Sequence, residues 1–154
     1  MGKRTSPGVV AQVYNQSQYL ETEFRDLKKE ISAAVGYALQ QLQGETKKKN
    51  FWFTVIFVDD QQIQELNQRY RNVNLPTDVL TFPYSPSEAD IFISVERALA
   101  QAKEYQQSLN QEITRLALHG VLHCLGYRDK DKKERKKMWQ IQEKILKNFF
   151  SRDY

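Results

Sequence analysis

The chain has 154 residues, and its 23 Lys or Arg against 19 Asp or Glu give a formal net charge of +4 at pH 7. With 40% hydrophobic and 12% aromatic residues, the composition excludes a disordered chain. One cysteine, Cys124, excludes an intrachain disulfide framework and fits a cytoplasmic protein. The longest nearly apolar run, residues 51–58, is far shorter than the roughly 20 residues that span a membrane, so no membrane association is expected. Residues 1–8 read as a flexible tail, and residues 9–154 are expected to form a single domain.

The first third of the chain predicts two strands separated by a long amphipathic helix. Apolar residues recur at three- and four-residue steps from Leu20 to Leu42, and Gly44 is expected to end this helix. Strands are expected before and after it, at 9–14 and 51–58. The second strand is bulky and β-branched, which is typical of a strand buried on both faces.

The middle of the chain predicts a short helix followed by two neighbouring strands. Asp59 and the residue after it can cap the helix, and the polar segment 71–77, which contains a proline, reads as a loop. A strand is expected at 78–84, and another at 89–95. Pro83 has no backbone N–H to donate, so the first of these strands is expected at the edge of the sheet.

Three helices are expected in the last third of the chain. The middle one is predicted at 111–125, with Asn110 as its N-cap and Gly126 as its stop. Because some strands are joined through helices while two lie close in sequence, the pattern predicts an α+β fold with a small mixed sheet. The bulky side chains of the last helix are expected among the core and docking residues, namely Met138, Trp139, Phe149 and Phe150.

The positive charge is concentrated in one segment. Residues 128–137 read RDKDKKERKK, with seven basic and three acidic residues, so this run carries the whole net charge. One interpretation is the solvated face of a helix. The other is a patch that attracts phosphate groups, favoured by its position directly after both histidines. The candidate residues of such a patch are Lys130, Lys132, Lys133, Arg135, Lys136 and Lys137.

The two histidines of the chain have the spacing of a metal site. His119 and His123 are four residues apart in a predicted helix, so their rings lie on one face and can hold one divalent ion. Gly126 stops the helix, and a tight turn there would bring Asp129 back toward the two rings. A carboxylate is an acceptable third ligand, and three ligands with one open position are typical of a catalytic site.

Other interpretations of this segment remain open or are disfavoured. The histidines can be an ordinary pair of polar or half-buried side chains. Some zinc peptidases share the spacing, but their general base is a glutamate directly after the first histidine, where this chain has Gly120. Cys124 follows His123 yet points to a different side of the helix, so it is expected to pack rather than to ligate or react.

Three segments of the chain resemble the motifs of one family. HGVLHCLGY at 119–127 is similar to the signature of the YbeY family, metal-dependent bacterial endoribonucleases of ribosomal RNA maturation. ELNQRYRNVNLPTDVLTFP at 65–83 resembles its second signature, and DIFIS at 90–94 resembles one of its strands. Met138 also stands where the family carries a methionine. The agreement in order and spacing extends from about Val9 to the C-terminal helix.

The resemblance implies an α+β fold in which helices pack on a mixed four-stranded sheet, with a zinc site on the second-last helix. His119 and His123 match two of the family's three metal histidines, and Arg71 matches an arginine that faces a groove for single-stranded RNA. Asp129 replaces the third histidine of the family. Because a carboxylate is a harder ligand than imidazole, Mn²⁺ or another divalent ion becomes more competitive with Zn²⁺.

The function that follows from the resemblance is RNA cleavage in small-subunit rRNA processing and ribosome quality control, in the cytoplasm. Arg71, His119 and His123 are the expected catalytic residues, and the partners are single-stranded RNA, rRNA and the small ribosomal subunit. Glu112 and Asp90 have only weak claims as a general base. The alternative is a non-catalytic RNA- or ribosome-binding assembly factor that has lost the metal through the change at position 129.

Overall fold

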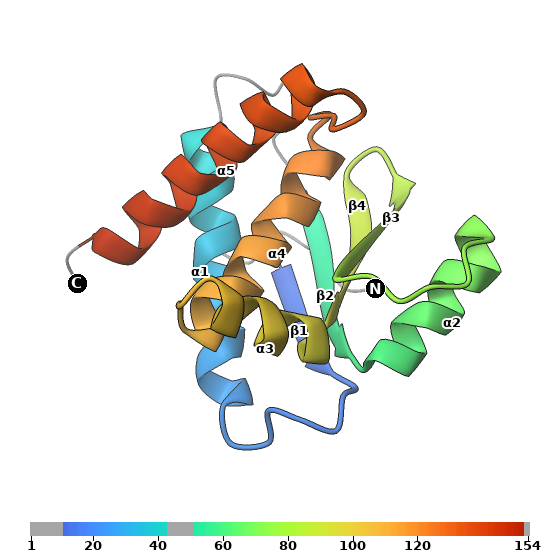
Figure 1. Cartoon of the computed structure of the whole chain (residues 1–154). Coiled ribbons are helices and arrows are strands. Elements are labelled where there is room, and N and C mark those ends of the chain that lie inside the picture. Colours follow the sequence, from blue (N-terminus) through green and yellow to red (C-terminus); the bar gives the residue numbers. More distant parts are fainter. Residues whose placement is uncertain (1–10, 43–50, 153–154) are drawn as a thin grey trace, which may run out of the picture.

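A computed structural model describes residues 11–42 and 51–152, in which five helices cover one four-stranded sheet (Figure 1). The expected tail, the first two residues of the first strand and Gly44 lie outside the described residues. None of the described helices is long and apolar enough to cross a membrane. The α+β prediction is confirmed, with elements β1 (Ala11–Asn15), α1 (Phe24–Gln41), β2 (Trp52–Val58), α2 (Asp60–Arg71), β3 (Val79–Ser85), β4 (Glu88–Ser94), α3 (Val95–Glu104), α4 (Leu109–Cys124) and α5 (Lys132–Ser151).

The sheet is mixed, with the strand order β1-β2-β4-β3. β1, β2 and β4 run parallel, and β3 pairs antiparallel with β4 at the edge. Pro83 therefore lies on an edge strand, as its missing N–H predicts, and the register shifts between Pro83 and Ser85. The short connection between β3 and β4 accounts for the antiparallel pair, and the longer helical connections account for the parallel pairs.

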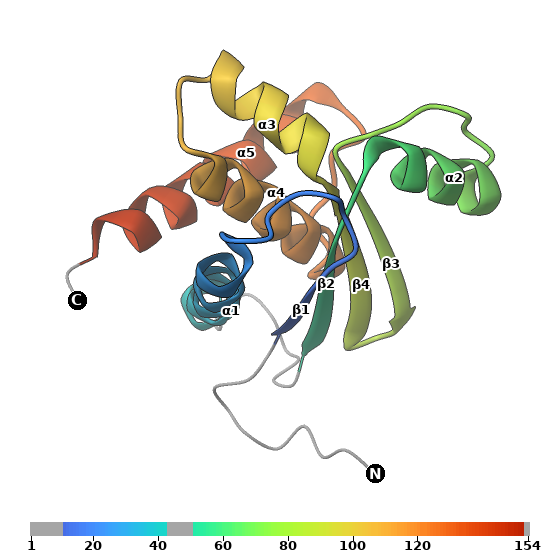
Figure 2. The same ribbon diagram turned by 90° about the horizontal axis from the view of Figure 1, so that it is seen from below.

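The sheet separates two layers of helices. α1, α3, α4 and α5 lie on one side, and α2 lies alone on the other (Figure 2). Successive side chains of a strand point to opposite faces, so β2 supplies both layers. Phe53, Val55 and Phe57 enter the main core with α1 and α4, while Ile56 and Val58 pack toward α2. β2 is thus buried on both faces, as its sequence predicts.

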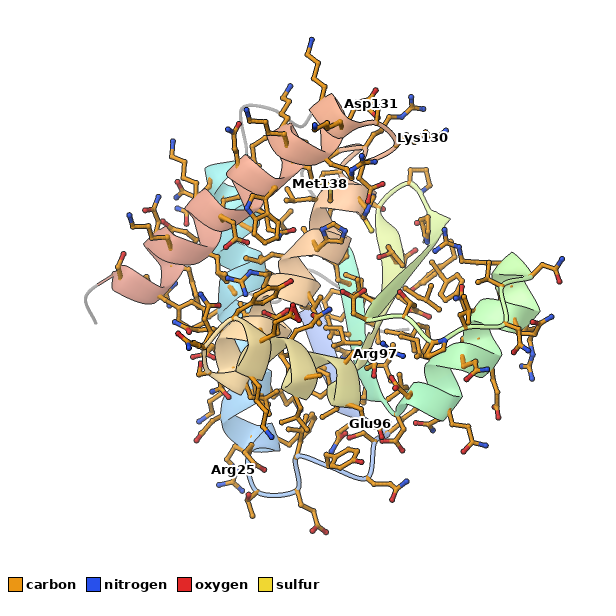
Figure 3. All side chains as sticks on the ribbon, viewed as in Figure 1. Arg25, Glu96, Arg97, Lys130, Asp131 and Met138 are labelled. Atoms are coloured by element: carbon orange, nitrogen blue, oxygen red, sulfur yellow. The ribbon has the colours of Figure 1, made fainter. Side chains whose placement is uncertain are left out.

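A second apolar cluster fixes α5 against α1 and α4. Met138 and Phe149 are almost fully buried in it, together with Leu118 and Leu122 of α4. Figure 3 shows Met138 on the side of α5 that faces α4. Trp139, expected with the core and docking residues, is instead 51% exposed, because one step along a helix rotates the side chain by about 100°.

Two helix starts differ from the sequence prediction. α1 begins at Phe24 instead of Leu20, because Leu20 has a positive φ of 69° that an α-helix cannot contain. α4 begins at Leu109, with Ser108 as its N-cap in place of Asn110. Ser108 Oγ accepts the backbone N–H of Gln111, and the side-chain oxygen of Gln111 accepts the backbone N–H of Ser108. This reciprocal pair satisfies two free N–H groups, which a cap at Asn110 would not.

Gly120 allows α4 to approach the sheet closely. A Cβ atom at this position would lie 2.8 Å from Cγ2 of Ile91 and 3.1 Å from Oγ1 of Thr81. Ile91 is fully buried in β4, and protein interiors are close-packed, so its side chain cannot shift without disturbing its neighbours. The absence of a side chain at Gly120 therefore sets the distance between the helix that carries both histidines and the sheet.

Substituting Gly120→Ala is expected to lower the free energy of unfolding by about 1–2 kcal/mol, because the cost of overpacking exceeds the gain in helix propensity. Urea unfolding measures this difference. Ala100→Gly, at an exposed position of α3, is the control for propensity alone and should lose about 1 kcal/mol. A Gly120→Ala variant more stable than the parent would contradict the close contact.

Candidate metal centre

Three side chains converge at the C-terminal end of α4. The Nε2 atoms of His119 and His123 are 3.2 Å apart, and Oδ2 of Asp129 lies 3.2 Å from His123 Nε2 and 3.9 Å from His119 Nε2. All three residues are partly exposed, so their ligand atoms can be reached from solvent. The structure thus brings together the three residues that the sequence predicts as ligands.

The donor set fits a divalent metal ion. Two ligand atoms on a tetrahedral zinc ion, each bonded at about 2.0–2.1 Å, lie roughly 3.3 Å apart. The three ligand atoms here lie within 4.8 Å of one another, and two of their separations are 3.2 Å. Two imidazole nitrogens and one carboxylate oxygen suit zinc and also harder divalent ions. Three protein ligands leave a coordination position for water or substrate.

A glycine turn directs the chain from α4 back to Asp129. α4 ends at Cys124, and Gly126 takes a positive φ of 102° that L side chains rarely adopt. The N–H of Tyr127 then donates to the carbonyl of Leu122 at 3.1 Å, which closes the helix end. This is the local geometry that the sequence predicts from Gly126.

The first turn of α5 holds the loop that carries Asp129. Asp131 caps α5 by accepting the N–H of Glu134 at 2.8 Å, and Glu134 accepts the N–H groups of Lys130 and Asp131 in return. Arg135 donates to the carbonyls of Asp129 and Lys130 at 3.4 and 3.3 Å. Figure 3 shows Lys130 and Asp131 in this loop, beside the start of α5. Asp129 is thus held near the histidines by bonds within the protein.

A family model described as Endoribonuclease YbeY matches residues 12–150 of the chain. The chain belongs to the YbeY family. It is 40% identical over 131 residues to Endoribonuclease YbeY of Acholeplasma laidlawii, an alignment covering 82% of this chain and 81% of the relative. The onion yellows phytoplasma relative of the same name is 35% identical over 149 residues, covering 91% and 94%. A Thermotoga maritima protein solved in solution matches with a TM-score of 0.60 and 24% identity over 91% of this chain and 89% of that one, which supports the fold.

Arg71 belongs to a different helix from the two histidines of the candidate metal centre. It is the exposed last residue of α2, the helix on the opposite side of the sheet from α4 (Figure 2). Asn72 ends α2 in the left-handed conformation, with a φ of 58°, and the buried Asn67 side chain donates to the carbonyl of Leu75 at 2.9 Å. This turn and this hydrogen bond hold the loop after Arg71. The YbeY resemblance is the basis for the role of Arg71, and that role stays a prediction.

The structure also shows the positions of the basic run and of the two carboxylates considered as a general base. All seven basic side chains of residues 128–137 are exposed, as expected, although Arg135 has the loop-holding role described above. Glu112 is 1% exposed and paired with Arg115, which leaves it no free path to a substrate. Asp90 precedes Ile91, whose side chain meets α4, so strand alternation directs Asp90 to the opposite face.

Burial and charge act on two titratable groups of this segment. Burial lowers the pKa of His123, the nearby His119 ring lowers it further, and Asp129 acts in the opposite direction. Burial raises the pKa of the Cys124 thiol to about 12. Cys124 packs against the main core and is protonated at neutral pH, in agreement with its predicted packing role.

One residue beside the metal centre was missed by the sequence analysis. Gln142 of α5 lies with its Oε1 atom 2.8 Å from Nδ1 of His119, and it is 2% exposed. It stands one helical turn after Met138, on the stripe of α5 that faces α4. The sequence does hold one sign of this contact: Gln142 is a polar residue on an apolar helix stripe. A buried amide needs hydrogen-bond partners, so such a residue is expected to contact another polar group.

Variants of Asp129 and Asp131 should distinguish metal binding from helix capping. Asp129→Ala is expected to lose zinc, because two ligands remain. Asp131→Ala should keep zinc and lose about 1 kcal/mol of stability, the usual cost of removing an N-cap. Asp129→His supplies a third imidazole and should tighten zinc binding. Zinc titration against a competing chelator, with urea unfolding of each variant, measures both effects, and unchanged zinc affinity in both Asp129 variants would remove this residue from the site.

Stability of the metal-free protein should fall as the pH is lowered through the pKa of His123. Folding depresses this pKa below the ordinary value of 6.5, so the unfolded chain binds more protons in that range and stability is present above it. Urea unfolding between about pH 7 and about pH 5.5 should show the loss. His123→Asn should flatten the slope, and equal slopes for parent and variant would rule out this contribution.

Proposed function

We propose that this chain is a metal-dependent endoribonuclease that cuts single-stranded RNA in the cytoplasm, during small-subunit rRNA processing and ribosome quality control. The observation that carries the proposal is the convergence of His119, His123 and Asp129 in a member of a family named for endoribonuclease activity. Zn²⁺ is the proposed ion, and Mn²⁺ is a competitor because one ligand is a carboxylate.

The roles of the residues follow from their chemistry. A divalent ion in such a site supplies a more acidic bound water and polarises a phosphoryl oxygen. His119, His123 and Asp129 would hold the ion and leave one position open. Arg71 presents a planar fork of donors that suits a phosphate, and it would bind the backbone and offset charge that develops during cleavage.

The exposed basic run supports an RNA substrate over a small phosphate ester. It begins two residues after Gly126 and continues into α5, so positive charge extends from the candidate metal centre along one helix. Charges of this kind bind phosphates without reading bases, which suits a nuclease that recognises single strands by their backbone. The residues proposed to guide the RNA are Lys130, Lys132, Lys133, Arg135, Lys136 and Lys137.

A second candidate is a non-catalytic assembly factor that binds rRNA or the small subunit. The observation that favours it is Asp129, which stands where the resemblance implies a third histidine. The basic run would then be the functional surface, and RNA binding would be independent of metal. The two candidates make opposite predictions for the effect of a chelator.

Cleavage of a fluorescent single-stranded RNA by the purified protein tests the proposal. With stoichiometric Zn²⁺ or Mn²⁺ we expect cleavage that a chelator and His123→Ala abolish. Arg71→Ala should reduce the rate by about 10²–10³-fold, the usual effect of removing a donor to developing charge, with little change in stability. Arg69→Ala, an exposed neighbour in the same turn of α2, is the matched control and should retain activity. RNA binding without cleavage at any metal concentration would establish the assembly-factor alternative.

A further inference from the structure

A hydrogen-bonded relay connects the candidate metal centre to α5. Gln142 contacts His119 through its amide oxygen at 2.8 Å, and its Nε2 donates to Oε2 of Glu143 at 3.1 Å. Gln142 is 2% exposed, so water cannot readily replace either partner. Its amide is therefore placed between one ring nitrogen and one carboxylate.

Arg115 of α4 holds both oxygens of Glu143. Its Nε and Nη2 atoms donate to the two oxygens of Glu143 at 2.9 and 3.0 Å, a two-pronged ion pair. Arg115 also donates to the buried Glu112 and is itself only 6% exposed. A guanidinium carries donors only, so both oxygens of Glu143 act as acceptors in this pair.

The acceptor role of Glu143 fixes the orientation of the Gln142 amide. An ionised carboxylate must face the NH₂ end of the amide, so the amide oxygen must face His119. An amide oxygen also only accepts, so Nδ1 of His119 has to carry the hydrogen. A neutral imidazole with hydrogen on Nδ1 has its lone pair on Nε2, the atom that faces His123 and Asp129.

We propose that Gln142 is a positioning residue that sets the tautomer and ring orientation of His119, and that the ion pair of Glu143 with Arg115 fixes the orientation of Gln142. The lone pair of His119 Nε2 then points into the metal centre before any ion arrives. The inference rests on the proposed metal dependence only for its consequence, a higher metal affinity. The tautomer itself is a property of the metal-free protein.

The relay differs from an ordinary packing role for Gln142. A merely structural glutamine would contribute to stability without changing which nitrogen of His119 bears hydrogen. An outer partner of a metal-bound histidine usually changes metal affinity by about 10–100-fold when it is removed. Tautomer and affinity therefore separate the two roles, and stability does not.

The test compares Gln142→Leu with Gln140→Leu, an exposed position on the same helix. In ¹⁵N-histidine NMR of the metal-free parent at about pH 8, where imidazole is neutral, His119 is expected to show hydrogen on Nδ1. Gln142→Leu should shift His119 toward the tautomer with hydrogen on Nε2 and weaken Zn²⁺ binding by about 10–100-fold. Gln140→Leu should match the parent in both measurements.

A second variant keeps the shape of the relay. Glu143→Gln removes the charge, so the amide of Gln142 is free to turn and His119 should populate both tautomers. If Gln142→Leu fails to fold, Glu143→Gln still tests the predicted tautomer. An unchanged His119 tautomer in a folded variant would overturn the proposal. If the parent binds no Zn²⁺ but the variants show the predicted change in the His119 tautomer, the positioning role stands and the metal-dependent function fails.

Discussion

The tight packing of α4 on the sheet is the constraint on which the rest of the molecule depends. Because Gly120 carries no side chain, the helix lies directly on β3 and β4, and Ala117 and Val121 fill the core on that side. His119 and His123 are consequently held on a rigid helix, and a neighbouring face of this helix packs against α5. Core packing and the loop bonds behind Asp129 set the ligand positions, so the site has little freedom to take other geometries.

The sequence was most informative where the geometry is local. His119, His123 and Asp129 come from one helix end and one turn, so the period of the helix and a glycine were enough to predict their convergence. The sequence could not predict Gln142, because its contact with His119 joins residues 23 positions apart and depends on how α5 packs across α4. The same limit applies to Ser108, since choosing between adjacent caps depends on which side chain finds a reciprocal partner.

The position of Arg71 depends on the fold and could not be read from its motif alone. The motif around it was recognisable in sequence, yet the face of the sheet that α2 covers follows from the side chains of β2, β3 and β4 on that face. α2 and α4 lie on opposite sides of the sheet (Figure 2).

The edge strand β3 has a consequence for how this protein behaves among its own copies. An exposed strand with a full row of free N–H and C=O groups is a template for pairing with another chain. Pro83 interrupts that row, and the register shift beside it bends the strand. The sheet is therefore poorly suited to grow by adding a strand at this edge, which disfavours intermolecular sheets between copies of this chain.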